Sequence, residues 1–156
     1  MPDYQRTPHD FTTGETPAAS VFDGLPGGVA GVVTAASATG GIGASPVTVL
    51  SRVVTLNASK LHMFLFQCNL ESTTVLDKFR ITIKDGASTI VYRDHRCYTA
   101  GSYETVTVLG FATDLAAGSH TITVTIERVA GSGTGNETSA STSPKALVIF
   151  DAGPNS

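Results

Sequence analysis

The chain has 156 residues, of which 41% are apolar and 15% charged, and its formal net charge is −3. This length suits one domain, with room for an additional arm, and is enough to bury a sizeable core. The sequence contains no run of Lys or Arg to supply the basic face that nucleic-acid binding requires, and no apolar stretch approaches the ~20 residues of a membrane span. The first residues lack the charged start and apolar stretch of a signal peptide, which predicts synthesis in the cytoplasm.

Residues 1–46 are predicted to form an extended arm that orders only against a partner surface. Pro2, Pro8 and Pro17 interrupt any helical pattern in its first half. Residues 24–46 are rich in glycine, whose backbone entropy opposes independent folding. The valines of this segment are nevertheless too apolar for a plain flexible linker. The arm is also acidic, and a disordered tail is the alternative interpretation.

From residue 47 to residue 156 the pattern is that of a β-sandwich domain. Residues 47–56 and 60–70 are expected to form its first two strands. Both faces of the second strand are apolar, with His62, Phe64, Phe66 and Cys68 on one face and Leu61, Met63 and Leu65 on the other. Such a strand is expected to be central in its sheet or to lie at an interface.

The remaining strands are expected at residues 79–84, 89–93, 103–111, 120–129 and 145–151, with a hairpin at Asp85-Gly86. Residues 121–127 alternate strictly between polar and apolar, as in a half-buried antiparallel strand. Residues 146–150 do not alternate, so both faces of that strand should be covered, one of them by another subunit. Together these strands predict an all-β, antiparallel, jelly-roll-type β-sandwich with an extended N-terminal arm.

No catalytic, cofactor or metal site is predicted. Asp94 and His95 are neighbours on a strand and therefore point to opposite faces, and no His or Cys cluster has metal-ligand spacing. His120, which follows Ala-Gly-Ser at a strand start, is expected to be structural, either by capping a turn or by facing its symmetry mates near a threefold axis. Cys68 lies in an apolar strand pattern and is read as a buried free thiol. A Cys68–Cys97 bridge is the alternative if the protein matures outside the cytosol.

The turn Leu115-Ala-Ala-Gly-Ser-His-Thr121, the Gly/Ser/Thr loop at 130–144 and the closing strand Ala146-Leu-Val-Ile-Phe-Asp-Ala-Gly153 occur together near the end of the chain. With these features, residues 50–153 resemble the jelly-roll domains of small structural proteins of tailed bacteriophages, which are similar to domains of the tumour-necrosis-factor and complement-C1q type. The resemblance implies a homotrimer in which the inward strands of three copies pack around an axis. The apolar character of both faces of the strands at 61–68 and 146–150 favours the same assembly.

The resemblance further implies a virion protein, made in the host cytoplasm and located on the capsid surface. The resulting hypothesis is a trimeric capsid decoration (cement) protein that stabilises the shell. Its arm would bind the major capsid protein through Tyr4, Arg6, Phe11, Phe22, Val29, Val32 and Val33. Its trimer interface would contain Leu61, Met63, Leu65, His120, Leu147 and Ile149. The alternative is a tail-fibre or receptor-binding domain, whose loops 84–102 and 130–144 would recognise a host glycan or protein.

Overall fold

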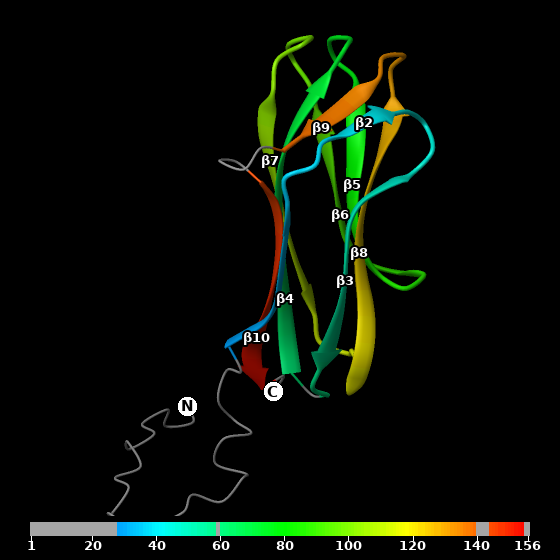
Figure 1. Ribbon diagram of the computed structural model, residues 1–156. Helices are drawn as coiled ribbons and strands as arrows, with labels where there is room; N and C mark the ends of the chain where they lie inside the picture. The colour runs from blue at the N-terminus through cyan, green and yellow to red at the C-terminus, as the bar shows by residue number, and fades with distance from the viewer. Residues whose placement is uncertain (1–27, 59, 140–143, 155–156) are drawn as a thin grey trace, which may run out of the picture.

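The computed structural model describes residues 28–58, 60–139 and 144–154, which form two antiparallel β-sheets packed face to face (Figure 1). Sheet A contains β1 (Gly28–Ala35), β2 (Thr39–Ile42), β4 (Lys60–Ser72), β7 (Glu104–Ala112), β9 (Gly135–Thr138) and β10 (Lys145–Pro154). Sheet B contains β3 (Val47–Leu56), β5 (Lys78–Asp85), β6 (Ser88–Arg96) and β8 (Gly118–Ala130). The predicted all-β, antiparallel, jelly-roll-type sandwich is confirmed.

The long strand β4 organises sheet A. It pairs with β7 along one edge, and with β10 and then β9 along the other. Strands β1 and β2 complete the sheet by pairing with β10 and β9. Sheet B has the order β3-β8-β5-β6. Apart from the β5–β6 hairpin, neighbouring strands therefore come from non-consecutive parts of the sequence, as in a jelly roll.

The core lies between the two sheets and is built by alternate residues of each strand. Phe64, Phe66 and Leu70 point inward from β4, while Ile122 and Ile126 point inward from β8, and all are fully buried. Each such side chain contributes about 1.5–3 kcal/mol by leaving water. The period-two patterns read from the sequence therefore identify the strands, and each of the seven expected strands is present to within three residues at either end.

Residues 28–42 differ from the expected arm, because they form β1 and β2 within sheet A. Strand β1 pairs with β10 from Gly28 opposite Asp151 to Ala35 opposite Lys145, with a bulge between Val29 and Gly31. At Gly31 a Cβ atom would lie 2.7 Å from Cγ1 of Val54 on the facing sheet, so glycine permits this close approach. The glycine-rich segment thus orders against this chain's own edge strand, and an arm could comprise only residues before Gly28.

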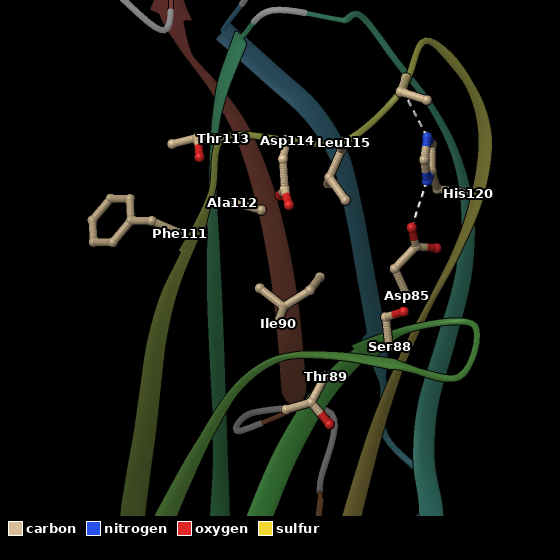
Figure 2. A pocket seen from close by; sticks show the side chains of 11 residues that line it. Asp85, Ser88, Thr89, Ile90, Phe111, Ala112, Thr113, Asp114, Leu115 and His120 are labelled. Atoms are coloured by element: carbon tan, nitrogen blue, oxygen red, sulfur yellow. Dashed lines mark hydrogen bonds and ion pairs between the residues drawn. The ribbon is translucent and has the colours of Figure 1, made fainter.

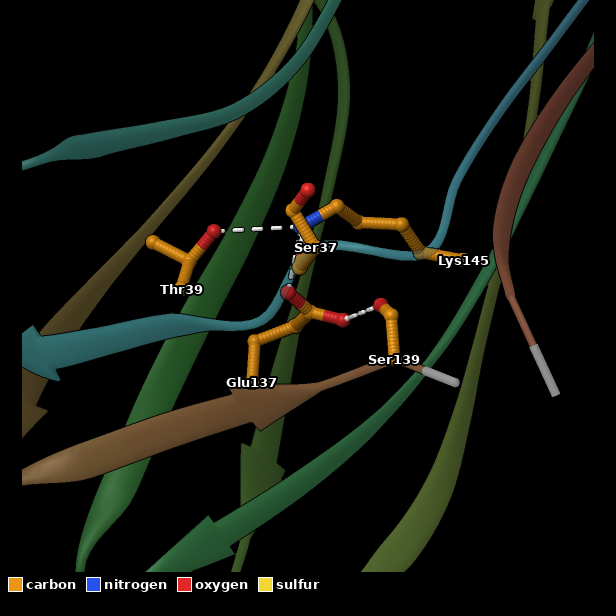
Figure 3. A network of polar contacts seen from close by, with 5 residues as sticks. All are labelled: Ser37, Thr39, Glu137, Ser139 and Lys145. Carbon is orange, nitrogen blue, oxygen red and sulfur yellow. Dashed lines mark hydrogen bonds and ion pairs between the residues drawn. The ribbon is translucent and has the colours of Figure 1, made fainter. Parts of the chain in front are cut away.

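A buried ion pair secures the junction between β9 and β10 (Figure 3). Nζ of Lys145 donates to Oε2 of Glu137 at 2.5 Å, and the two side chains are 2% and 0% exposed. The same ammonium donates to the carbonyl of Ser37 at 2.7 Å and to Oγ1 of Thr39 at 3.1 Å, while Ser139 donates to the other Glu137 oxygen. Buried charges persist only when they are paired and hydrogen-bonded in this way, and this network attaches the β1–β2 connection to the sandwich.

Two further segments connect the strands. The loop expected at 130–144 contains the short strand β9, which pairs with the end of β4. Residues 73–77 form bends and a turn in which Leu76 has a φ of 64°. The buried carboxylate of Asp77 anchors this turn by accepting hydrogen bonds from Oγ of Ser72 at 2.6 Å and from the backbone N–H of Ser132 at 3.0 Å.

Candidate functional site

The outer surface of sheet A carries a continuous set of apolar side chains. Across β1, β10, β4 and β7 the strand register aligns them in two rows, Val29–Phe150–Met63–Phe111 and Val32–Val148–Leu65–Leu109. Leu61 extends the set along β4. We call these nine residues the apolar face. They are all exposed or half-buried, since alternation directs the other residues of the same strands into the core.

The exposure of the apolar face is greatest on its outer strands. Val29 is 54% exposed on β1, and Leu109 and Phe111 are 49% and 53% exposed on β7. The next row toward β9 is more polar, with Thr34, Ala146, Gln67 and Thr107 in register. Beyond it, Oγ1 of Thr105 donates to Asn69 at 2.9 Å and Asn136 donates to Glu71 at 3.0 Å. Large contiguous apolar patches with polar borders are typical of protein–protein interaction sites.

Three of the six expected trimer-interface residues lie on this face. Leu61, Met63 and Leu65 project outward from β4, on the side opposite His62, Phe64 and Phe66, as the alternation predicted. Their cross-strand neighbours on β10 and β7 are also apolar. The part of the prediction that concerned β4 therefore points to a real surface of the fold.

The expected interface role of Leu147 and Ile149 is wrong. Both side chains are 0% exposed and form part of the core, so they cannot reach a neighbouring subunit. Both faces of β10 are apolar, and the sequence could not say which one turns inward. The outward residues are Val148 and Phe150, which the expected set omitted.

His120 is also placed away from the apolar face, because it belongs to β8 of sheet B. Its Nδ1 lies 2.6 Å from Oδ2 of Asp85, and its Nε2 lies 2.9 Å from the carbonyl oxygen of Ala116. Both partners are acceptors, so the doubly protonated ring can donate to each. The hydrogen bond that His120 donates to Asp85, and then the one that it donates to the carbonyl of Ala116, raise the pKa of His120. This agrees with the expected structural, turn-capping role.

The expected capsid-contact residues divide into three groups. Tyr4, Arg6, Phe11 and Phe22 lie outside the described residues. Val29 and Val32 lie on the apolar face beside the trimer set, while Val33 faces Leu147 and packs against the core. Val29 and Val32, which were expected to contact the capsid, therefore share one surface with Met63 and Leu65, which were expected to form the trimer interface.

Sequence reasoning missed Leu109 and Phe111, although a signal was present. The first outward positions of β7 are Thr105 and Thr107, and its last outward positions are the apolar Leu109 and Phe111. Val106 and Val108 point inward, so the second half of the strand is apolar on both faces. The loss of alternation after Thr107 marks the point where the outer surface of sheet A becomes apolar.

The described residues present no competing chemical centre. No group of three or more His, Cys, Asp or Glu side chains in the described ranges could hold a metal ion, and no helix there is long and apolar enough to cross a membrane. Cys68 and Cys97 are both buried and free, which confirms the reading of Cys68. Burial raises the pKa of Cys68 to about 12 and that of Cys97 to about 11, so neither supplies a thiolate nucleophile near neutral pH.

No protein-family model and no curated protein matches this sequence. Among solved structures, the chain is similar to infectious bursal disease virus Gx strain, with a TM-score of 0.49 and 13% identity over 83% of this chain and 37% of that chain. It is also similar to Eiger TNF from S. frugiperda, with a TM-score of 0.43 and 8% identity over 64% of this chain and 63% of that chain. TmCBM61 in complex with β-1,4-galactotriose gives a TM-score of 0.38 and 15% identity over 65% and 60%. The chain spans less than two thirds of the length of each structure, and these likenesses concern the fold alone.

Proposed function

We propose that this protein is a homotrimeric structural protein of a tailed-bacteriophage virion, which binds the outer capsid surface and stabilises the shell. The observation that supports assembly is the apolar face, which spans four adjacent strands of sheet A. A surface of this kind is costly to leave in water and stabilises an oligomer when copies cover one another. The resemblance to trimeric phage jelly rolls supplies the number of copies.

An interface of standard size would stabilise the proposed association. A standard interface buries about 800 Å² per partner. If that area were apolar, its removal from water would contribute about 20 kcal/mol per subunit before the costs of lost rotation, translation and side-chain ordering. The aromatic residues Phe111 and Phe150 and the flexible Met63 are of types that are enriched in such interfaces.

The proposed capsid contact lies in residues 1–27. Strand β1 begins at Gly28, beside Asp151 near the end of β10, so the preceding chain leaves from one end of the sandwich. Residues 1–27 contain Arg6 as their one basic side chain and four acidic ones, while the basic and acidic residues of 28–156 cancel. An acidic segment suits a basic groove on the capsid, and a segment that orders on binding can cover a large surface.

The test is a deletion of residues 2–27, which keeps the whole of β1 and therefore the apolar face. We expect the truncated protein to remain trimeric in sedimentation velocity at micromolar concentration. We also expect it to lose co-sedimentation with purified capsids that lack the native protein. Retained capsid binding by truncated trimers would contradict the proposed role of this segment, and a monomeric full-length protein would contradict the proposed assembly.

A receptor-binding domain of a tail fibre is the second candidate, and one feature favours it. Tyr98, which follows Cys97 after β6, is 69% exposed, and Val75 and Leu76 in the turn after β4 are 51% and 55% exposed. The turn that presents them is fixed, since the N–H of Leu76 donates to the carbonyl of Cys97 at 2.7 Å. Copy number separates the two candidates, because a decoration protein is present in hundreds of copies per virion and a fibre in a handful. Densitometry of purified particles measures it.

A further inference from the structure

A cavity of about 490 Å³ opens at the edge of the sandwich where β6 of sheet B approaches β7 of sheet A. One wall is the β5–β6 turn with the start of β6, residues 85–90, and the other is the end of β7 with the following connection, residues 111–116. In Figure 2, Asp114 and Leu115 point from the second wall toward Ile90 on the first. Cavities of about 300–1,000 Å³ are typical of small-molecule sites.

Hydrogen bonds hold the two walls in place. His120 lies between them, with Nδ1 bonded to Asp85 of the turn and Nε2 bonded to the carbonyl of Ala116 in the connection (Figure 2). The protonated ring satisfies both acceptors and neutralises the Asp85 carboxylate. The space between the walls is therefore formed in the absence of a ligand, which lowers the entropic cost of filling it.

The residues that line the cavity include a carboxylate, hydroxyl groups and apolar side chains. Asp114 supplies a carboxylate that makes no ion pair or hydrogen bond with any described residue. Ser88 and Thr89 supply hydroxyl groups that can donate or accept. Ile90 and Leu115 supply apolar surface. The cavity thus combines a strong acceptor, adaptable hydroxyls and an apolar floor within one small volume.

We propose that this cavity binds a saccharide of one or two pyranose rings. Sugar hydroxyls donate charge-assisted hydrogen bonds to a carboxylate such as that of Asp114, while the hydroxyls of Ser88 and Thr89 complete the polar contacts. The apolar C–H face of a pyranose packs on Ile90 and Leu115. An anionic ligand is disfavoured by Asp114, and a cationic ligand would leave the hydroxyl groups and much of the apolar floor unused.

This inference does not depend on the proposed virion function. The cavity shares only Phe111 with the apolar face, and that side chain points away from the cavity (Figure 2). A variant that loses saccharide binding should therefore still form trimers and still bind capsids. Failure of one proposal leaves the other to be judged by its own experiment.

The experiment uses the full-length protein with labelled Ile and Leu methyl groups, observed by NMR. The probes are the methyl pyranosides of glucose, galactose, mannose, rhamnose and N-acetylglucosamine, the disaccharides lactose and cellobiose, and n-butylammonium as a cationic comparison. We expect at least one saccharide to shift the methyl signals of Ile90 and Leu115 at millimolar concentration. The signals of Ile149 in the core and Leu65 on the apolar face should stay unchanged.

Two variants and one control locate the site. Asp114→Ala should weaken binding of that saccharide at least about tenfold, because a charge-assisted hydrogen bond is lost. Ser88→Trp should abolish binding by occupying the space while leaving Asp114 in place. Glu127→Gln, which removes a carboxylate from the outer face of sheet B away from the cavity, should leave binding unchanged.

Several results would overturn the proposal. They are the absence of any saccharide-induced shift, a response of Ile90 and Leu115 to n-butylammonium alone, or shifts confined to another surface such as that around Tyr98. Unchanged affinity in Asp114→Ala, with normal thermal unfolding of the variant, would equally exclude this cavity as the site.

Discussion

The two outer surfaces of this sandwich are built by the same alternation and yet differ in character. On sheet A, the outward positions of β1, β10, β4 and β7 carry the apolar face. On sheet B, the outward positions of β8 and β5 carry hydroxyl groups and charges, including Thr121, Thr123, Glu127 and Arg80. Only the apolar face of sheet A is therefore expected to be covered by another protein surface.

The charged side chains on the outer surface of sheet B form ion pairs with one another. Arg80 donates from Nε to Oδ1 of Asp94 at 2.8 Å and stacks over the ring of Tyr92, 4.4 Å from its centroid. Lys78 joins the same carboxylate at 2.6 Å. Hydrogen bonds from Arg80 and then Lys78 lower the pKa of Asp94 to about 2, so the pairing persists over the physiological range. Sheet B is thus suited to contact with water, and the apolar face of sheet A is suited to contact with protein.

The largest expected effect comes from placing a charge at the centre of the apolar face. Leu65 stands between Val148 and Leu109 in the strand register, so Leu65→Asp would bury an unpaired carboxylate in the interface. We expect the proposed trimer to dissociate into folded monomers in sedimentation velocity. Thr123→Asp, at an outward position of β8 in register with Lys84, is the matched control and should remain trimeric. A trimeric Leu65→Asp protein would contradict the assignment of this surface.

The next effect concerns the interior of sheet A. Glu137→Ala leaves the ammonium of Lys145 buried without its carboxylate partner, and loss of one member of a buried pair costs about 3–5 kcal/mol. Chemical denaturation should show this loss in the free energy of unfolding. The comparison is Lys78→Ala, which removes one of the two cations beside the partly exposed Asp94 on sheet B and should cost far less. Equal effects in the two variants would show that the Lys145 network is hydrated.

The orientation of β10 gives a third, sharper comparison between adjacent residues. In the monomeric Leu65→Asp background, Ile149→Ala should lower the free energy of unfolding by about 2–5 kcal/mol, because it creates a cavity in the core. Val148→Ala, which truncates an outward side chain, should have a much smaller effect on the monomer but should weaken the trimer of the otherwise native protein. The reverse pattern in denaturation would mean that β10 turns its other face to the core.

The smallest expected effect is a pH dependence at the start of β8 in sheet B. Asp85 raises the pKa of His120 above its ordinary value of 6.5, so the folded protein holds this proton more tightly than the unfolded chain. The stabilisation is complete below pH 6.5 and disappears as the pH rises through the higher folded-state pKa. We expect His120→Gln to remove it, at a cost of about 1 kcal/mol at pH 6.

Thermal unfolding measured from pH 6 to pH 9 tests this, with the difference between the native protein and His120→Gln narrowing as the pH rises. Burial lowers the pKa of His62, which acts in the opposite sense and is present in both proteins. The charge of His120 adds a smaller lowering of the His62 pKa that the variant loses, so only the burial contribution cancels in their difference. A difference that stayed constant with pH would show that His120 acts as a neutral ring.

Much of the fold could be predicted because alternation alone locates strands. Residues 121–127 alternate without interruption and lie within β8, and the apolar strand at 60–70 is β4. The candidate site was only half predictable. Leu61, Met63 and Leu65 could be recognised because one face of β4 must meet the core and the other cannot, whereas β10 offered two apolar faces of which only one remains outside.

The sequence by itself determined that the chain is an antiparallel β-sandwich with more apolar surface than one core can bury. The tertiary structure decided which of those surfaces stays outside, because long-range pairing sets the face that each strand presents. Pairing with β10 also recruited the glycine-rich residues 28–35 as a strand, since backbone hydrogen bonds need no side-chain pattern. Local pattern is a property of neighbouring residues, but the choice between two equally apolar faces depends on partners that are distant in the chain.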